Sequence, residues 1–530
     1  MHINLRIGSI QPIRRFFTHT PTPPDTIQFA ILPYYFYLCH TLEGFINVTY
    51  TLTMKKILLL IALILSAVSL QAKPKPYIPW KNGPLKVSDN GTYLCHTNGK
   101  PFFWLGDTGW LLPERLDQAE AAYYLNGARE AGFNVVQVQT INGVPATNIY
   151  GQLSHIDGWN FSEIDRKGVY GYWDHVDYIV KVAEGYGIYI GMVPIWGGLV
   201  KSGAMDVEQA KAYGTFLGER YKDHPNIVWL IGGDLRGDIK TEVWEALANS
   251  IKAVDKNHLM TYHPFGRTSS IMWFHDAPWL DFNMFQSGHR RYDQIKGDGD
   301  DLAQASQTED NWRSVEAGLA RTPRKPIIDG EPSYEEIPQG LHDPSQPWWK
   351  APDARRYAYW AVFAGAFGHT YGNNAVMQMR KPGYGAAYGC KKTWYEGMED
   401  PGYNQMKHLK NLILTFPYFE RVPDQSIIAG ENGTRYDRLI ATRGNDYMLV
   451  YNYTNRPMSI DLTRISGKKK NAWWYSPVDG SLSYIGEFDS KITPFQYDGG
   501  HGAGYDMVLI AVDADKDYIA KDQTSLTRAD

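Results

Sequence analysis

The chain has 530 residues, of which 43% are hydrophobic and 21% are charged, and its formal net charge is −4. This composition is typical of a globular protein with room for one large domain and a smaller one. Phosphate binding needs clustered lysine and arginine, and the short run Lys468–Lys470 does not supply it, so nucleic acid is excluded as an expected partner.

The N-terminal part contains the pattern of a secretory signal peptide. Two lysines precede an apolar run at 57–70, and the small residue Ala72 follows it. The run is shorter than the ~20 residues that a spanning helix needs. We therefore expect a signal peptide at 54–72, translation from Met54, and residues 1–53 to be upstream sequence. The mature protein would then be exported, with no membrane partner once the signal peptide is removed.

From 73 to 413 the chain alternates between short apolar runs and longer amphipathic stretches, the pattern of β/α units. The predicted strands are 102–105, 134–139, 188–193, 227–231, 258–262, 281–285, 326–331 and 368–372. The predicted helices are 117–130, 172–184, 207–221, 243–254, 311–319 and 354–364. Eight such alternations predict an α/β protein of the (β/α)8 TIM-barrel type, which needs roughly 250 residues plus insertions. A doubly wound open sheet is the competing fold, but no GxGxxG follows an early strand.

The segment 414–530 changes character and predicts a small all-β, sandwich-like domain. Its expected strands are 439–441, 447–451, 472–475 and 507–512, and Pro477–Gly480 reads as a turn. The sequence leaves open whether Cys95 and Cys390 pair, and it leaves the oligomeric state and the role of this domain open.

In a barrel the chemistry lies at the C-terminal ends of the strands. Two carboxylates stand there, Asp234 after the fourth strand and Glu331 after the seventh. Glycoside cleavage needs two, one to protonate the leaving oxygen and one to attack the anomeric carbon or activate water. Asp234 could instead cap the following helix, but Asp238 lies nearer to that helix and suits this role better. Glu331 could instead pair with a loop arginine. Asp329 shares its strand face and is expected to support it by hydrogen bonding.

Further polar and aromatic residues gather at the predicted strand ends. Gln137 and Asn374 are among them. Those we expect to contact a sugar are Asp107, Trp110, Gln139, Trp196, His263, Gln286, His289, Tyr334, His369, Tyr371 and Asn373.

Other chemistries find no support. The sequence contains no HExxH, GxSxG or P-loop motif. The acidic stretch 297–301 lacks the ligand alternation of a calcium loop and is interpreted as a turn before a helix. We predict neither a metal nor a cofactor.

Several motifs resemble one known family. WLIGGD (229–234), YHPFGRTSS (262–270), WLDFNMFQSGH (279–289), DGEPSYE (329–335) and RRYAYWAVFAGAFGHTYGNN (355–374) are similar to the apiosidase-like glycoside hydrolases, glycoside hydrolase family 140. The tail, with AWWYSPVDGS (472–481), resembles the collagen-binding-type β-domain that usually follows this barrel.

The resemblance implies a retaining mechanism with Asp234 as acid/base and Glu331 as nucleophile. It also implies an exported bacterial enzyme, periplasmic or extracellular, that releases apiose-linked sugars from the pectic polysaccharide rhamnogalacturonan II. Its partner would be an oligosaccharide or polysaccharide. Retention requires the two carboxyl groups to lie ~5–5.5 Å apart. Two alternatives stay open: another retaining glycosidase, acting on galactosides or arabinosides, and a non-catalytic glycan-binding protein on the same barrel.

Gly233 stands where many barrel glycosidases place an asparagine that holds the sugar's 2-hydroxyl. We therefore expect the glycines at 232 and 233 to let backbone and sugar approach closely. The 2-hydroxyl must then be held elsewhere, and His263 or Asn373 are the candidates.

Overall fold

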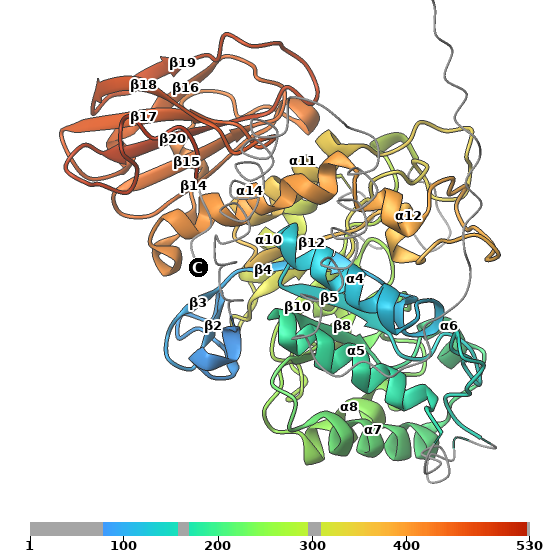
Figure 1. The fold of residues 1–530 in the computed structure, drawn as a ribbon. Coiled ribbons are helices and arrows are strands. Elements are labelled where there is room, and N and C mark those ends of the chain that lie inside the picture. The colour runs from blue at the N-terminus through green and yellow to red at the C-terminus, as the bar shows by residue number, and fades with distance from the viewer. Residues whose placement is uncertain (1–77, 157–158, 160–168, 295–308, 527–530) are drawn as a thin grey trace, which may run out of the picture. The chain divides into compact units, whose positions relative to one another are not determined.

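The computed structural model describes residues 78–156, 159, 169–294 and 309–526 (Figure 1). Three predictions fall outside the described residues: the upstream segment 1–53, the signal peptide at 54–72 and the turn at 297–301. Within the described part of the chain, no helix combines the length and apolar character that a membrane crossing needs.

Eight parallel strands form a closed barrel. They are β4 (Trp104–Thr108), β5 (Val135–Gln139), β6 (Tyr189–Val193), β7 (Ile227–Gly232), β8 (Met260–His263), β10 (Asn283–Gln286), β11 (Ile327–Asp329) and β12 (Gly368–Tyr371). Six pair in the order β12-β4-β5-β6-β7-β8, and β10 pairs with β11. Asp281 N donates to Met260 O (2.9 Å) beside β8, and Phe367 N donates to Ile327 O (3.2 Å) between β11 and β12. These links close the ring, which confirms the predicted barrel and excludes an open doubly wound sheet.

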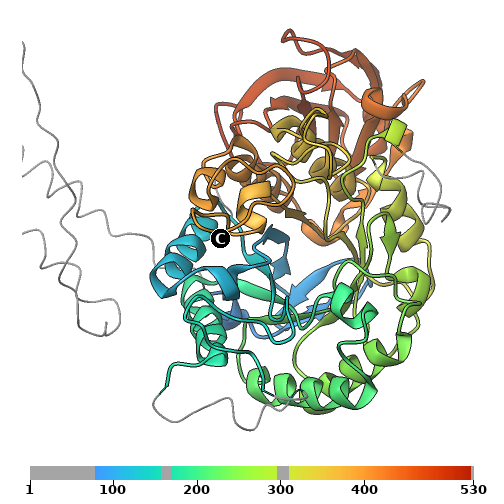
Figure 2. The same cartoon turned by 90° about the vertical axis from the view of Figure 1, so that its right-hand side faces the viewer.

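Helices surround the strands, as the blue-to-yellow part of Figure 2 shows. The main ones are α4 (Gln118–Glu130), α5 (Tyr172–Tyr186), α7 (Val207–Tyr221), α8 (Thr241–Val254), α10 (Asn311–Leu319), α11 (Ala351–Phe363) and α14 (Pro401–Thr415). Local signals set several of their ends. Asp117 and Glu120 form a capping box at the start of α4. Gly187 ends α5 in the left-handed conformation, with φ 74°.

The predicted cap of α8 is wrong. Lys240, with φ 58° and no capping side chain, precedes the helix. Asp238 instead binds the guanidinium of Arg236 at 3.0 and 2.5 Å. The neighbouring arginine competes for the carboxylate with the backbone N–H groups of the helix. The position of Asp238 close to the start of α8 was therefore not enough to make it the cap.

Shorter elements complete the N-terminal part and the loops. They are η2 (Pro79–Asn82), β1 (Leu85–Val87), β2 (Leu94–His96), β3 (Pro101–Phe102), α3 (Leu112–Arg115), α6 (Gly197–Lys201), β9 (Thr268–Ser269), α9 (Ile271–Phe274), η3 (Tyr292–Gln294), α12 (Asn374–Met377), α13 (Trp394–Gly397) and η5 (Tyr418–Glu420). Phe102, expected in the first barrel strand, belongs to the β1–β3 antiparallel sheet. Cys95 and Cys390 are both free and buried.

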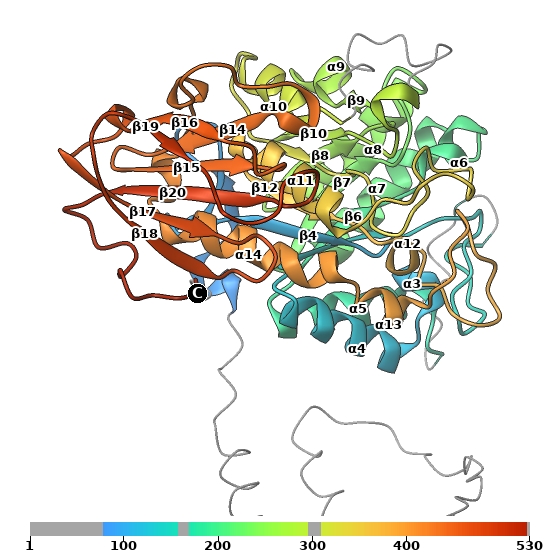
Figure 3. The same cartoon turned by 90° about the horizontal axis from the view of Figure 1, so that it is seen from above.

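The C-terminal part is antiparallel and all-β, as predicted (Figure 3). Its strands are β13 (Val422–Pro423), β14 (Leu439–Arg443), β15 (Tyr447–Asn452), β16 (Met458–Asp461), β17 (Lys469–Tyr475), β18 (Leu482–Asp489), β19 (Ile492–Phe495) and β20 (Met507–Asp513), with short turns η6 (Gln425–Ile427), η7 (Arg435–Asp437) and η8 (Leu462–Arg464). One sheet has the order β13-β14-β15-β20-β17-β18, and β16 pairs with β19. Residues from both enclose a separate apolar core that includes Ile460, Leu509 and Phe495.

This β-region packs on α11 of the barrel. Arg355 on α11 forms a bidentate ion pair with Asp506, at 2.9 and 2.6 Å, and both side chains are buried. Beside it, Tyr359 of the same helix stacks on Tyr451 of β15 with ring centroids 4.7 Å apart. The contact therefore combines apolar area with a fully paired charge.

Candidate active site

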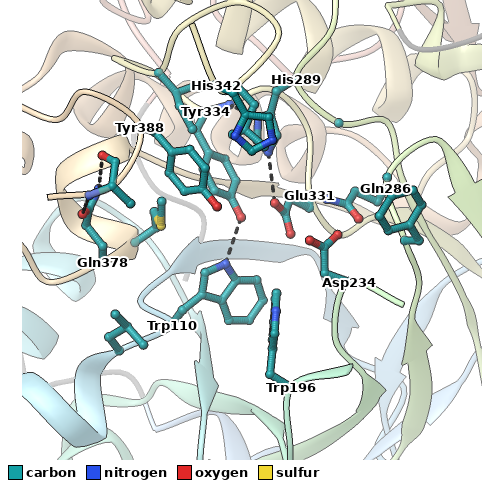
Figure 4. A pocket seen from close by; sticks show the side chains of 18 of the residues that line it. Trp110, Trp196, Asp234, Gln286, His289, Glu331, Tyr334, His342, Gln378 and Tyr388 are labelled. Atoms are coloured by element: carbon teal, nitrogen blue, oxygen red, sulfur yellow. Dashed lines mark hydrogen bonds and ion pairs between the residues drawn. The ribbon is translucent and has the colours of Figure 1, made fainter. Parts of the chain in front are cut away.

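A cavity of about 410 Å³ opens among the loops that follow the barrel strands. Its size is within the range of small-molecule sites, which is roughly 300–1,000 Å³. Eight of the thirteen site residues predicted from the sequence line it: Trp110, Gln139, Trp196, Asp234, Gln286, His289, Glu331 and Tyr334. Figure 4 shows the carboxyl groups of Asp234 and Glu331 turned toward each other within it.

A buckled backbone positions Asp234. Gly232, Gly233 and Asp234 follow one another with φ of 97°, 119° and 54°. A Cβ on Gly232 would lie 2.5 Å from His263 O, and one on Gly233 would lie 2.8 Å from the indole of Trp196. Both positions therefore require glycine, because of backbone conformation and of space. A non-glycine residue with positive φ, such as Asp234, stores strain that is typical of functional sites.

The same contacts correct our expectation about Gly233. The space over this glycine is occupied by the ring of Trp196. Gly197 N also donates to Gly233 O at 2.8 Å, so the α6 segment lies directly against the buckled backbone. Gly233 thus makes room for an aromatic wall of the pocket, and the sugar does not gain this space.

The surroundings of Asp234 favour its protonated form. Burial of the carboxyl and then the charge of Glu331 raise its pKa to about 6, although His263, His289 and a hydrogen bond with Gln286 act in the opposite direction. The residue keeps some exposure at the pocket, while its carboxyl is surrounded by protein. Asp234 can therefore carry a proton in mildly acidic solution.

Glu331 is held in the opposite state by two histidines. His289 Nε2 lies 3.1 Å from one carboxyl oxygen, and His263 Nε2 lies 3.4 Å from the other. Burial opposes ionisation of Glu331, but the two histidines together lower its pKa to about 2. The alternative of a salt bridge to a loop arginine is wrong, because histidines occupy both oxygens.

The orientation of His289 follows from its other ring nitrogen. Tyr334 N donates to Nδ1 at 3.4 Å, which leaves the proton on Nε2 to be donated to Glu331. The ring of Tyr334 packs edge-on against His289 at 4.7 Å. Trp110 Nε1 in turn donates to the Tyr334 hydroxyl at 3.2 Å. A chain of contacts that begins at Trp110 and passes through Tyr334 and His289 thus fixes the carboxylate of Glu331.

Two aromatic rings, those of Trp110 and Trp196, form one wall of the cavity. Trp110 and Trp196 lie 5.4 Å apart between ring centroids, and each also contacts the ring of His263, at 5.3 and 6.1 Å. Trp and Tyr faces next to polar groups suit a sugar, which presents both C–H and O–H groups.

The role of Asp329 as a hydrogen-bonding support for Glu331 stays a prediction, because its side-chain partners are other residues. Ser287 Oγ and Asn311 Nδ2 donate to one of its oxygens at 2.6 and 3.1 Å.

Five predicted sugar contacts do not line the pocket: Asp107, His263, His369, Tyr371 and Asn373. His263 is fully buried and acts on Glu331 instead. Asn373 caps α12 and donates to Asp400 at 2.8 Å.

The other three point away from the barrel axis. Tyr371 pairs with Asp107 in register across β12 and β4, and side chains alternate between the two faces of a strand. Tyr124 on helix α4 donates to Asp107 at 2.6 Å, and Tyr371 donates to Glu335. Asp107, His369 and Tyr371 therefore share the face that packs against the helices. The sequence predicted that these residues lie at strand ends, but it did not predict which face of the strand their side chains occupy.

Loop residues of the pocket escaped the sequence analysis. They include Arg115, Asn142, Phe265, Arg267, Arg290, His342, Gln378 and Tyr388. Most lie in the long loops after β8, β11 and β12, which carry no strand or helix periodicity. The glycine-rich stretch PGYGAAYGC (382–390) was the available signal, because glycines flanking a tyrosine indicate a shaped turn. Among the described residues, no group of three or more His, Cys, Asp or Glu side chains is arranged to hold a metal ion.

Comparisons with known proteins identify the families of both parts of the chain. Residues 88–420 match the family described as "Apiosidase-like, catalytic domain", and residues 422–512 match "Putative collagen-binding domain of a collagenase". The structure of a glycoside hydrolase family 5 protein from Bacteroides vulgatus is 65% identical, with a TM-score of 0.84 over 86% of this chain and 98% of that chain.

A second solved structure, a glycoside hydrolase, is 66% identical, with a TM-score of 0.83 over 84% of this chain and 100% of that chain. A third, from Bacteroides vulgatus, shares the fold at 14% identity and a TM-score of 0.56 over 82% of this chain and 83% of that chain. No curated protein matches the chain.

Proposed function

The chain belongs to the apiosidase-like glycoside hydrolases, and on that premise we propose that it is an exported, retaining enzyme that cleaves apiosyl linkages in side chains of rhamnogalacturonan II. One observation carries the chemistry. Asp234 and Glu331 share one pocket, and their environments move the two pKa values apart, to about 6 and about 2. Such a pair contains one acid and one ionised carboxylate, the set that glycoside cleavage requires.

In the first step, an ionised oxygen of Glu331 attacks the anomeric carbon of the bound sugar. The bond from that carbon to the leaving oxygen breaks, and the proton of Asp234 moves to this oxygen, so that the remainder of the glycan leaves as an alcohol. His263 and His289 orient the attacking carboxylate through the contacts described above.

In the second step, Asp234 has lost its proton and accepts one from water. The water oxygen attacks the anomeric carbon, and the bond to Glu331 breaks. The sugar is released with retained configuration, and both carboxyl groups return to their starting states. The raised pKa of Asp234 suits both of its roles, since a group near 6 both donates and accepts a proton readily.

The sugar and the compartment rest on other grounds. Family membership supports the choice of an apiosyl linkage, and the aromatic wall of Trp110 and Trp196 is compatible with any small sugar ring. Export rests on the signal-peptide pattern at 54–72. The same pattern predicts translation from Met54 and a mature chain that begins near Lys73, and finding residues 1–53 in the exported protein would contradict that start.

The test is to incubate the mature protein with rhamnogalacturonan II fragments and identify the released sugar, following the first-formed anomer by NMR. Release of apiose with retained configuration supports the proposal. Release of galactose or arabinose, from the polymer or from synthetic glycosides, would replace the sugar but keep the mechanism. Failure to hydrolyse any glycan would favour the glycan-binding alternative, and an inverted product would overturn Glu331 as nucleophile.

A further inference from the structure

A tight turn after β12 carries a tyrosine into the catalytic pocket. Cys390 N donates to Ala387 O at 3.1 Å, and the two residues between them, Tyr388 and Gly389, have φ of 53° and 65°. Two positive φ values at the centre of a turn are the signature of type I′, which strongly favours Asn or Gly at both positions. Tyr388 thus occupies a position where its side chain costs conformational energy.

Two amide side chains hold this strained turn in place. Ala387 N donates to Gln378 Oε1 at 2.8 Å, and Gln378 Nε2 donates to Asn374 Oδ1 at 2.9 Å. Asn374 Nδ2 donates to Tyr388 O at 3.1 Å. A residue keeps an unfavourable backbone conformation only where its surroundings over-determine it, and such residues cluster at functional sites.

The turn aims the phenol at the reacting centre. Tyr388 lines the same cavity as Asp234 and Glu331, and Figure 4 shows its ring extending into the pocket. Burial and the charges of these two carboxylates raise the pKa of Tyr388, so its hydroxyl keeps its proton and can donate.

Gly233 has no side chain that could hold the sugar's 2-hydroxyl beside the acid, so another residue must do so. Of our two candidates for this role, His263 is buried against Glu331 and Asn373 does not line the cavity.

We propose that Tyr388 is a substrate-contacting residue that donates a hydrogen bond to a hydroxyl of the sugar bound between Asp234 and Glu331, and that Asn374 positions it. This inference rests on the proposed function for its substrate, but not for its geometry. A contact to a sugar hydroxyl strengthens in the transition state, so its loss should reduce kcat/KM more than it weakens binding.

The first experiment measures kcat and KM on rhamnogalacturonan II oligosaccharides for Tyr388→Phe, with Tyr384→Phe as the matched control. Tyr384 is on the same loop but does not line the cavity. We expect Tyr388→Phe to lower kcat/KM at least about tenfold, largely through kcat, and Tyr384→Phe to leave it within about twofold. Near-native kinetics for Tyr388→Phe would overturn the contact.

Asn374→Ala tests positioning. It should lower kcat/KM in the wild-type background but cost little more in Tyr388→Phe, because the two changes remove one shared effect. Full additivity would show that Asn374 acts elsewhere, and circular dichroism checks that each variant is folded.

The second experiment needs no substrate, so it separates this inference from the proposed function. 3-Nitrotyrosine, which ionises near neutral pH, is incorporated at position 388 and, as a control, at 384. In Glu331→Gln the nitrophenol at 388 should ionise at lower pH than in the parent, since one negative charge is removed, while the nitrophenol at 384 should not change. An unchanged titration at 388 would show that the phenol does not face the carboxylates and would overturn the inference, even if the enzyme cleaves no rhamnogalacturonan II.

Discussion

His289 Nε2 lies 3.1 Å from Glu331 Oε1, and its Nδ1 receives the backbone N–H of Tyr334. The imidazole therefore holds the carboxylate in its ionised form from a fixed direction. Together with His263 on the second oxygen, it makes Glu331 the stronger acid of the two carboxyl groups and leaves the proton to Asp234.

Removing this histidine should weaken the nucleophile in a defined way. In His289→Ala, the pKa of Glu331 should rise toward its ordinary value, because burial raises this pKa and only His263 would remain to lower it. The acidic limb of the kcat/KM profile should move to higher pH, with kcat lower by on the order of tenfold. His289→Gln keeps an N–H donor and should shift the limb less. Equal profiles for wild type and His289→Ala would contradict the role of the histidine.

Activity should be greatest on the acid side of neutrality. The reaction needs Glu331 ionised and Asp234 protonated, so kcat/KM should decline as pH rises through about 6 and fall at the acid end only toward pH 2. Asp234→Asn and Glu331→Gln should each reduce kcat by at least about 1,000-fold while the circular dichroism spectrum stays native. The assay is hydrolysis across pH 3–9. An activity that rises steadily above pH 7 would remove Asp234 as the acid.

Gly233→Ala should damage both fold and site. The new Cβ would require φ near 119° and would lie 2.8 Å from the Trp196 ring, so we expect a loss of about 1–3 kcal/mol in the free energy of unfolding and reduced turnover. Gly203→Ala is the control, because Gly203 has φ of 84° and no atom within 4 Å of an added Cβ. Urea unfolding measures the loss of unfolding free energy in each variant. Gly203→Ala reports backbone strain alone, and Gly233→Ala reports backbone strain plus the clash with Trp196. Equal losses would show that Trp196 does not restrict position 233.

Asp107 should make stability depend on pH. Burial raises its pKa to about 7, although the hydroxyl of Tyr124 partly counteracts this. Because the folded-state pKa lies above the unfolded one, the contribution to stability is complete below about pH 4 and is lost as pH rises through about 7. Asp107→Asn keeps an acceptor for Tyr124 and does not ionise. Between pH 5 and pH 8, we expect the free energy of unfolding of the variant to rise relative to that of wild type by about a few kcal/mol at most.

Urea unfolding at both pH values measures this gain, and Glu335→Gln offers a comparison, since burial also raises the pKa of Glu335 to about 7. A difference between wild type and Asp107→Asn that does not change with pH would contradict the assignment.

Much of the barrel could be predicted because its elements are encoded locally. The capping box of Asp117 and Glu120, the stop at Gly187 and the buried apolar run at Ile227–Gly232 each depend on residues a few positions apart. Asp234 and Glu331 could be identified for a related reason, since both follow such runs directly.

Side-chain partners account for the errors. Asp238 was expected to suit the cap of helix α8, but it binds the side chain of its neighbour Arg236. The other partners come from distant parts of the chain. Asp107 and Tyr371 were expected to line the pocket. Asp107 instead binds Tyr124 of helix α4, and Tyr371 binds Glu335 of the loop after β11. Tyr388 went unnoticed because a strained turn has no periodic pattern, and two amides from another segment are needed to stabilise it.

The sequence by itself determined the class of fold, the all-β C-terminal region and the identity of the two facing carboxylates, because periodicity and strand ends are local properties of a chain. Only the tertiary structure moves the pKa values of these two carboxyl groups apart. That outcome depends on burial and on histidines from β8 and the segment after β10, which meet Glu331 only when the barrel closes. It also decided why Gly233 is glycine, since the ring of Trp196 reaches that backbone only in the folded chain.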